Sequence, residues 1–233
     1  MSIDLSSKTF LTFDVYGTLI DWETGIIEAY QPIFKTHGVQ VDDEYLLERF
    51  AFHEANVEAG PYKRYSDVLS IILQKLGEEF GFMPNDGELK RVSRSVEDWP
   101  AFPDSAKALA QLKKHFKLVV MSNVDDDLLA FSRKKLGVEF HEIITAQQVS
   151  NYKPNLAHFH EALKRLSDDK HILHVAQSLF HDHVPAKQMG WQSVWINRRA
   201  GKTGSGATPP ATATPDLEFP DLQSFADFVA ESL

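Results

Sequence analysis

The chain has no cysteine among its 233 residues. Disulfide scaffolds and thiol nucleophiles are therefore excluded, and the composition fits a reducing compartment. No uninterrupted apolar run approaches the ~18–20 residues of a membrane-spanning helix, so no membrane partner is expected. The first ten residues, MSIDLSSKTF, lack the apolar stretch of a secretory signal peptide. We therefore expect a cytoplasmic protein.

Positive charge is also scarce. Lys and Arg number 24 against 33 Asp and Glu, which gives a formal net charge of −9. Broad binding to nucleic acid needs a basic face, so no nucleic-acid partner is expected. The basic clusters at 133–135 and 198–199 are short, and we interpret them as solvated surface. The oligomeric state stays open, with a homodimer as one alternative.

The pattern from residue 22 to residue 98 is helical and poor in strands. Apolar residues recur at helical spacing in the first segment, at Ile26, Ile27, Tyr30 and Phe34. Pro100 and Pro103 then break the pattern. The expected helices are 22–37, 42–58, 65–80 and 85–96.

An apolar strand at 9–15 precedes this helical stretch, and strands alternate with helices after it. Such alternation predicts an α/β fold with a parallel sheet covered by helices on both faces. Residues 201–216 are rich in Gly, Pro, Thr and Ala, and we expect an irregular loop there. The later expected strands are 117–121, 140–145, 171–176 and 193–196. The later expected helices are 105–115, 125–136, 155–166, 184–189 and 222–232.

The segment 12–21, TFDVYGTLID, holds the strongest functional signal. Asp14 lies at the end of the apolar strand, and Gly17 and Thr18 turn the backbone directly after it. The carboxyl ends of strands in an open α/β sheet face the ligand-binding crevice, where an aspartate can act as a covalent nucleophile. The alternative is that Asp14 only ends the strand and caps the turn.

Three later segments place polar residues at similar points. Ser122 and Asn123 follow an apolar strand, although they could simply cap the next helix. Lys153 precedes a proline that begins a helix, although a lone lysine is usually solvated. Asp182 ends the segment 175–182, VAQSLFHD.

Taken together and in this order, these segments resemble the four motifs of the haloacid dehalogenase superfamily. The resemblance implies a Rossmann-like core at 1–21 and 99–233 with an inserted helical cap at 22–98. Phosphatases of the superfamily carry a second aspartate where this chain has Tyr16, and the tyrosine version looks like the L-2-haloacid dehalogenase branch. A halide leaves without a proton, so such an enzyme can do without the second acid, which a phosphatase needs for its leaving group.

The resemblance also implies roles for individual residues. Asp14 would be the nucleophile, and Lys153 and Asp182 would lie beside it with catalytic roles. Thr18, together with backbone N–H groups, would stabilise the charge that develops during hydrolysis of the ester. Substrate contacts fall to Tyr16, Ser122, Asn123, Gln177 and to Arg49 of the cap, which would receive the leaving halide; a surface arginine is the alternative. The chain departs from the branch at Gln177, Leu179 and Phe159, and Leu179 cannot hydrogen-bond to the hydrolytic water. Gln177, His181 or His183 could take that part.

No cofactor and no metal site are predicted. His171 and His174 of one strand would point to opposite faces, which argues against a zinc cluster. Asp14 and Asp182 could still offer ligands to magnesium, but Tyr16 and the single acid of the fourth motif fit an unmetallated site better.

The expected function is hydrolytic dehalogenation of small (S)-2-haloacids to 2-hydroxyacids through an aspartyl ester, with the haloacid and the halide product as partners. One rival is a phosphatase that acts on a small phosphoester and has replaced its general acid. The other is a non-catalytic descendant that uses the cleft for binding.

Overall fold

The computed structural model describes residues 3–167 and 169–233. A parallel sheet forms the centre of the core, with strand order β3-β2-β1-β4-β5-β6. β1 lies in the middle, where Thr12 pairs with Val119 of β2 on one side and with His174 of β4 on the other. The strands are β1 (Phe10–Phe13), β2 (Lys117–Ser122), β3 (Glu142–Thr145), β4 (Ile172–Ala176), β5 (Ser193–Ile196) and β6 (Leu217–Phe219).

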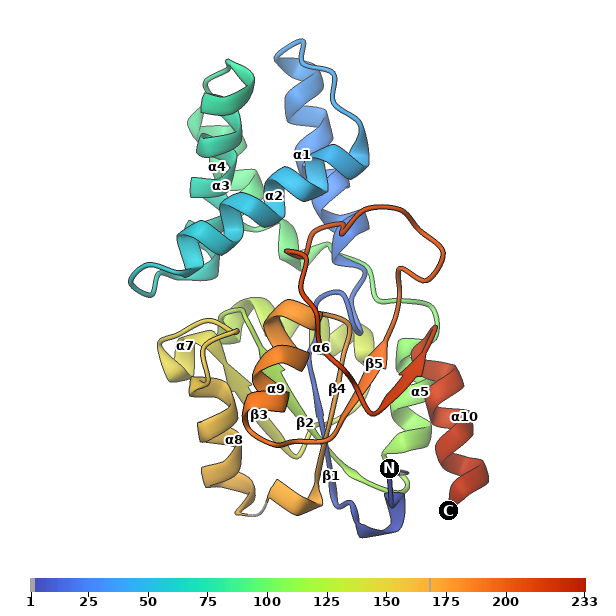
Figure 1. The fold of residues 1–233 in the computed structure, drawn as a ribbon. Coiled ribbons are helices and arrows are strands. Elements are labelled where there is room, and N and C mark those ends of the chain that lie inside the picture. The colour runs from blue at the N-terminus through green and yellow to red at the C-terminus, as the bar shows by residue number, and fades with distance from the viewer. Residues whose placement is uncertain (1–2, 168) are drawn as a thin grey trace.

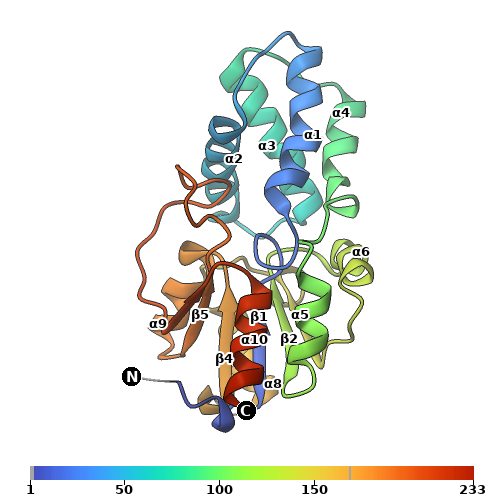
Figure 2. The same cartoon turned by 90° about the vertical axis from the view of Figure 1, so that its right-hand side faces the viewer.

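Helices cover both faces of the sheet, as Figures 1 and 2 show. Alternate side chains of β2 enter two separate clusters, because successive residues of a strand point to opposite faces. Leu118 and Val120 join the larger cluster, whereas Val119 and Met121 join the smaller one. The helices of the core are α5 (Ser105–Leu112), α6 (Asp126–Leu136), α7 (Ala146–Val149), α8 (Ala157–Leu166), α9 (Val184–Gln188) and α10 (Leu222–Ser232).

A helical cap follows β1 and stands over the carboxyl ends of the strands (Figure 1). Its interior is aromatic: Phe50 meets Tyr30 and Trp22 edge to face, with ring centroids 5.5 Å and 6.4 Å away. Gly25 lets the cap approach the core closely, since a Cβ atom there would lie 2.3 Å from the ring of Trp99. The cap helices are α1 (Trp22–Thr36), α2 (Asp43–Glu58), α3 (Tyr65–Phe80) and α4 (Asp86–Ser93).

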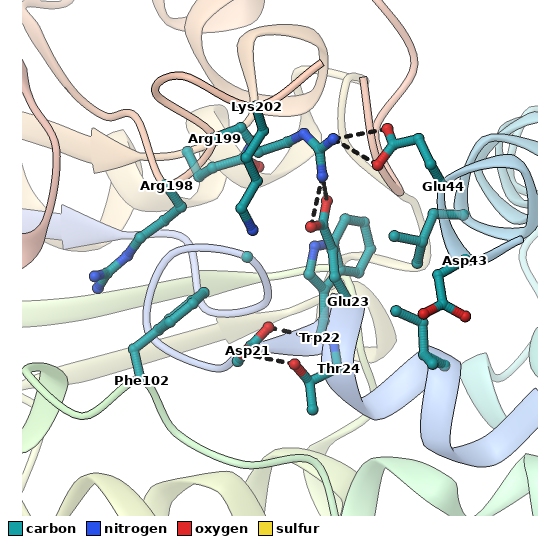
Figure 3. A pocket seen from close by; sticks show the side chains of 14 residues that line it. Asp21, Trp22, Glu23, Thr24, Asp43, Glu44, Phe102, Arg198, Arg199 and Lys202 are labelled. Carbon is teal, nitrogen blue, oxygen red and sulfur yellow. Dashed lines mark hydrogen bonds and ion pairs between the residues drawn. The ribbon is translucent and has the colours of Figure 1, made fainter. Parts of the chain in front are cut away.

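A second junction between cap and core lies after β5. Arg199 donates to both carboxylate oxygens of Glu23 in α1 and of Glu44 in α2, at 2.7–2.9 Å (Figure 3). The N–H groups of Gly206 and Ala207 donate to the same two carboxylates. The irregular segment 201–216 therefore rises beside the cap and is bonded to it (Figures 1 and 2).

The predicted α/β fold with a parallel sheet and an inserted cap is confirmed. One interpretation is wrong: the side chains of Arg198 and Arg199 are about nine-tenths buried and ion-paired rather than solvated. β6 was not predicted, because it has only three residues at the edge of the sheet. A π-helical turn (Leu179–His183) also precedes the helix expected at 184–189. Within the described residues, no helix is both long and apolar enough to cross a membrane.

Candidate active site

Lys153 is the centre of a buried ionic group at the carboxyl ends of the strands. Its side chain is 1% exposed, and its Nζ donates to Asp14 Oδ1 at 2.9 Å and to Asp182 Oδ1 at 2.6 Å. The third proton goes to the backbone oxygen of Met121 at 2.9 Å. Asp14 follows β1 and Asp182 lies in the turn after β4, so neighbouring strand ends bring them together. The structure thus unites three residues that the sequence singled out separately.

The electrostatics of this group differ at each carboxylate. Burial raises the pKa of Asp14, and the negative charge of Asp182 adds to this, while Lys153 and Thr18 oppose it. Burial would also raise the pKa of Asp182, but Lys153 and a bond from His174 hold it below its ordinary value. Burial disfavours the ammonium of Lys153, but the two aspartates outweigh this and raise its pKa. Lys153 is therefore charged, and Asp182 is its permanent counter-ion.

Thr18 fixes the second oxygen of Asp14. Its Oγ1 donates to Asp14 Oδ2 at 2.7 Å and accepts from the N–H of Gln177 at 2.9 Å. The turn between Asp14 and Thr18 contains Gly17 with φ of 90°, a left-handed conformation that glycine adopts at low cost. Both oxygens of Asp14 are thus held in place before any substrate arrives.

Asp182 is supported by a buried relay that the sequence did not suggest. Thr12 Oγ1 lies 2.9 Å from His174 Nδ1, and His174 Nε2 lies 3.1 Å from Asp182 Oδ1. Thr12 and His174 are paired across β1 and β4, which explains their contact. We therefore interpret His174 as a residue that positions Asp182.

Asn123 joins the loop of Lys153 to the cap. Its Oδ1 accepts from the N–H of Lys153 at 2.7 Å, and its Nδ2 donates to the carbonyl of Lys153 at 3.0 Å. The same Nδ2 lies 3.3 Å from Glu58 Oε2 in α2. Asn123 therefore lines the cavity, but its side-chain amide is already hydrogen-bonded to groups of the protein.

The cap closes the cavity with acidic and aromatic side chains that the sequence analysis did not assign. Asp125 positions this wall, because it accepts from Tyr62 OH at 2.6 Å and from the N–H of Tyr65 at 2.8 Å. The cavity that remains has a volume of about 30 Å³. The lining residues are Asp14, Tyr16, Trp22, Glu54, Glu58, Tyr65, Asn123, Val124, Lys153, Ser178, His181 and Asp182.

Tyr16 lines the cavity with its ring, whereas its hydroxyl is used inside the core. The hydroxyl lies 2.9 Å from Ser132 Oγ, and the ring meets Trp99 edge to face. Burial raises the pKa of Tyr16 above its ordinary value. Tyr16 therefore presents its ring to the cavity, and its hydroxyl is engaged with Ser132.

Other predicted substrate contacts do not reach this cavity. Arg49 pairs with Glu79 of α3 at 2.6 Å and lies over the ring of Phe52 at 4.4 Å, so the structure does not bring it over Asp14. Its position on α2 points it toward α3 rather than toward the core. Ser122 is fully buried and is not among the lining residues, and Gln177 contacts the site only through its backbone N–H.

The residues around Lys153 do not fit a magnesium ion between Asp14 and Asp182. Both oxygens of Asp14 and Oδ1 of Asp182 already accept from side chains, which leaves Asp182 Oδ2 as the free oxygen of the pair. Over residues 3–167 and 169–233, no three His, Asp or Glu side chains are grouped as ligands of one ion.

Comparisons with known proteins identify the family and the fold. The chain belongs to the haloacid dehalogenase-like hydrolases, whose family model matches residues 10–181. It is 21% identical to haloacetate dehalogenase H-2 of Moraxella sp. (strain B) over 94% of this chain and 97% of that protein. It is 25% identical to (S)-2-haloacid dehalogenase 1 of Pseudomonas sp. (strain CBS-3) over 80% and 83%. The structure of L-2-haloacid dehalogenase from Xanthobacter autotrophicus superposes with a TM-score of 0.77 at 19% identity, covering 96% of this chain and 98% of that one.

Proposed function

We propose that this protein hydrolyses the carbon–halogen bond of small 2-halo-substituted carbonyl compounds, with (S)-2-haloacids as reference substrates. The observation that carries the proposal is the ionic group of Asp14, Lys153 and Asp182. Tyr16 supplies no acid beside it, so the site suits a leaving group that needs no proton. The similarity to dehalogenases supports the same reaction.

In the first step, an oxygen of Asp14 attacks the carbon that bears the halogen. A carbon–oxygen bond forms as the carbon–halogen bond breaks, the halide takes the bonding electrons, and the configuration at carbon inverts. Lys153 and Thr18 hold the carboxylate in one orientation, which lowers the entropy cost of reaching the transition state.

In the second step, water attacks the carbonyl carbon of the Asp14 ester. His181 is placed to take the proton, because it lines the cavity and its Nε2 has no partner while Nδ1 lies 3.1 Å from Ser178 Oγ. Burial lowers the pKa of His181 to about 4, so the ring is neutral and can accept. His181 then gives this proton to the departing alkoxide, which leaves as the hydroxyl of the product. The new carboxyl group of Asp14 releases the second proton of the water and returns as a carboxylate.

Halide release from a panel of 2-haloacids, with and without EDTA, tests the proposal. We expect release that EDTA does not change. In heavy-oxygen water, multiple turnovers should place the label in Asp14, as peptide mass spectrometry would show. No label in Asp14 during turnover would contradict the ester mechanism, and phosphoester hydrolysis that requires magnesium would favour a phosphatase.

A further inference from the structure

The cap wall of the cavity is made of two carboxyl groups one helical turn apart on α2. Glu54 is 2% exposed, and its Oε1 accepts from Tyr65 OH at 2.7 Å. Glu58 Oε2 accepts from Asn123 Nδ2 at 3.3 Å, while its Oε1 is buried without a partner. Residues i and i+4 of a helix share one face, so both acids look onto the cavity above Asp14.

Among the described residues that line the cavity, no lysine or arginine is free to pair with the carboxylate of a substrate. Lys153 is the one lysine or arginine among the described lining residues, and its three protons are already donated. The arginines that flank the acids in sequence are also engaged: Arg49 with Glu79, and Arg64 with Asp125 and Asp127. A substrate carboxylate in this cavity would therefore be buried beside carboxyl groups without a counter-ion, which is costly.

The two acids are built to accept hydrogen bonds. The neighbours that contact them, Tyr65 and Asn123, are both donors. Burial raises the pKa of Glu54 to about 8, and burial together with Glu54 raises that of Glu58 well above its ordinary value. Both carboxyl groups are therefore uncharged near neutral pH, and their carbonyl oxygens still accept hydrogen bonds. An N–H group of a ligand would satisfy an open oxygen of this wall, whereas a carboxylate would find no counter-ion in the cavity.

Glu58 also borders a second, open cavity, which it lines together with Lys153, Asn151, Asn155 and Phe180. Glu58 is therefore shared between this cavity and the one above Asp14.

We propose that Glu54 and Glu58 select a substrate whose carbonyl group carries an uncharged hydrogen-bond donor, a carboxamide in place of a free carboxylate. This rests on the proposed dehalogenation and names its substrate class. The balanced reaction is a 2-haloamide plus water to a 2-hydroxyamide plus halide and a proton, through the same ester on Asp14. The amide N–H groups of the substrate donate to Glu58 Oε1 and to the second carboxyl oxygen of Glu54.

The experiment compares 2-chloropropionamide with 2-chloropropionate, which differ only in the group under test. For the wild-type protein we expect kcat/KM for halide release to favour the amide by about tenfold or more, the worth of a hydrogen bond to a charged or strongly polar group. Glu58→Leu and Glu54→Leu should each reduce this preference, because Leu removes the hydrogen-bond acceptor. Glu48→Leu, the same change on the exposed face of α2, is the matched control and should leave the preference unchanged.

The outcomes separate the two proposals. Halide release that favours the acid, or an amide preference that survives both Leu substitutions, overturns the assignment of Glu54 and Glu58 and leaves dehalogenation standing. No halide from either compound with folded wild-type protein overturns dehalogenation itself. The wild-type ratio needs no variant, so the test holds even if Glu54→Leu fails to fold, which circular dichroism would show.

Discussion

The two walls of the cavity are organised differently. On the core wall, Asp14, Lys153 and Asp182 hold one another from neighbouring strand ends, and Asp182 Oδ2 is the one carboxylate oxygen left free. On the cap wall, Glu54 accepts from Tyr65 and Glu58 accepts from Asn123, and each acid keeps its second oxygen available. The core wall, whose carboxylates are held by hydrogen bonds, suits a reaction that needs a fixed geometry. The cap wall, which has oxygens left to accept hydrogen bonds, suits the recognition of the substrate. We expect substitutions in the core to change rate and substitutions in the cap to change preference.

The largest effect is expected from Asp14→Asn. An amide is a far weaker nucleophile, so halide release should fall by on the order of 10⁴–10⁶-fold, as for other lost nucleophiles. The far-ultraviolet circular dichroism spectrum should be unchanged. Turnover within tenfold of wild type would move the nucleophile elsewhere.

The next effect concerns stability as well as rate. Lys153→Met leaves two buried carboxylates without their shared cation, and we expect a loss of about 3–5 kcal/mol in the free energy of unfolding. Chemical denaturation measures this loss. In the double variant with Asp182→Asn the combined loss should be smaller than the sum of the two single losses, because the groups are in contact. Additive losses would mean that the pair does not act as a unit.

A pH profile gives a smaller but specific effect. Asp14 must be ionised to attack, and its pKa is raised by burial and by Asp182, so kcat/KM should fall as the pH drops through a value above the ordinary 3.8 of aspartic acid. Asp182→Asn removes the negative neighbour and should move this acid limb to lower pH. Glu48→Gln should leave the limb in place, and a limb at or below 3.8 in the wild type would contradict the raised pKa.

The smallest effect is expected at Arg49, where the motif resemblance had implied a large one. Its partner is Glu79, and both side chains are about a quarter exposed, so the pair is worth about 0–1 kcal/mol. Arg49→Ala should keep kcat/KM within about fivefold of wild type, which corresponds to that energy. A loss of 100-fold would show that the cap rearranges and brings Arg49 to the substrate.

The core wall was predictable because it depends on local pattern and topology. Asp14 and Asp182 follow apolar strands that must be parallel, and parallel strand ends meet at one edge of the sheet. The cap wall was not predictable in the same way. α2 carries charged residues on several faces, among them Arg49, Glu54 and Glu58, and its sequence alone does not say which face meets the core. That choice is made by contacts between distant segments, such as Asp125 with Tyr62 and Tyr65.

The support of Asp182 was missed for a related reason. His174 lies inside an ordinary apolar strand, and only the pairing of β1 with β4 places it between Thr12 and Asp182. β6 was missed because a strand of three residues is too short to show a periodic pattern. By contrast, the helices of the cap have enough turns for their apolar spacing to be read.

The bonds of Arg199 fasten one side of the cap to the core. Arg199 ties the segment after β5 to Glu23 in α1 and to Glu44 in α2 (Figure 3). The part of the cap that follows α2 is fastened as well, because Asp125 of the core accepts from Tyr62 at 2.6 Å. Moving the cap away from Asp14 on either side therefore breaks hydrogen bonds, and the closed form is the one that these contacts favour.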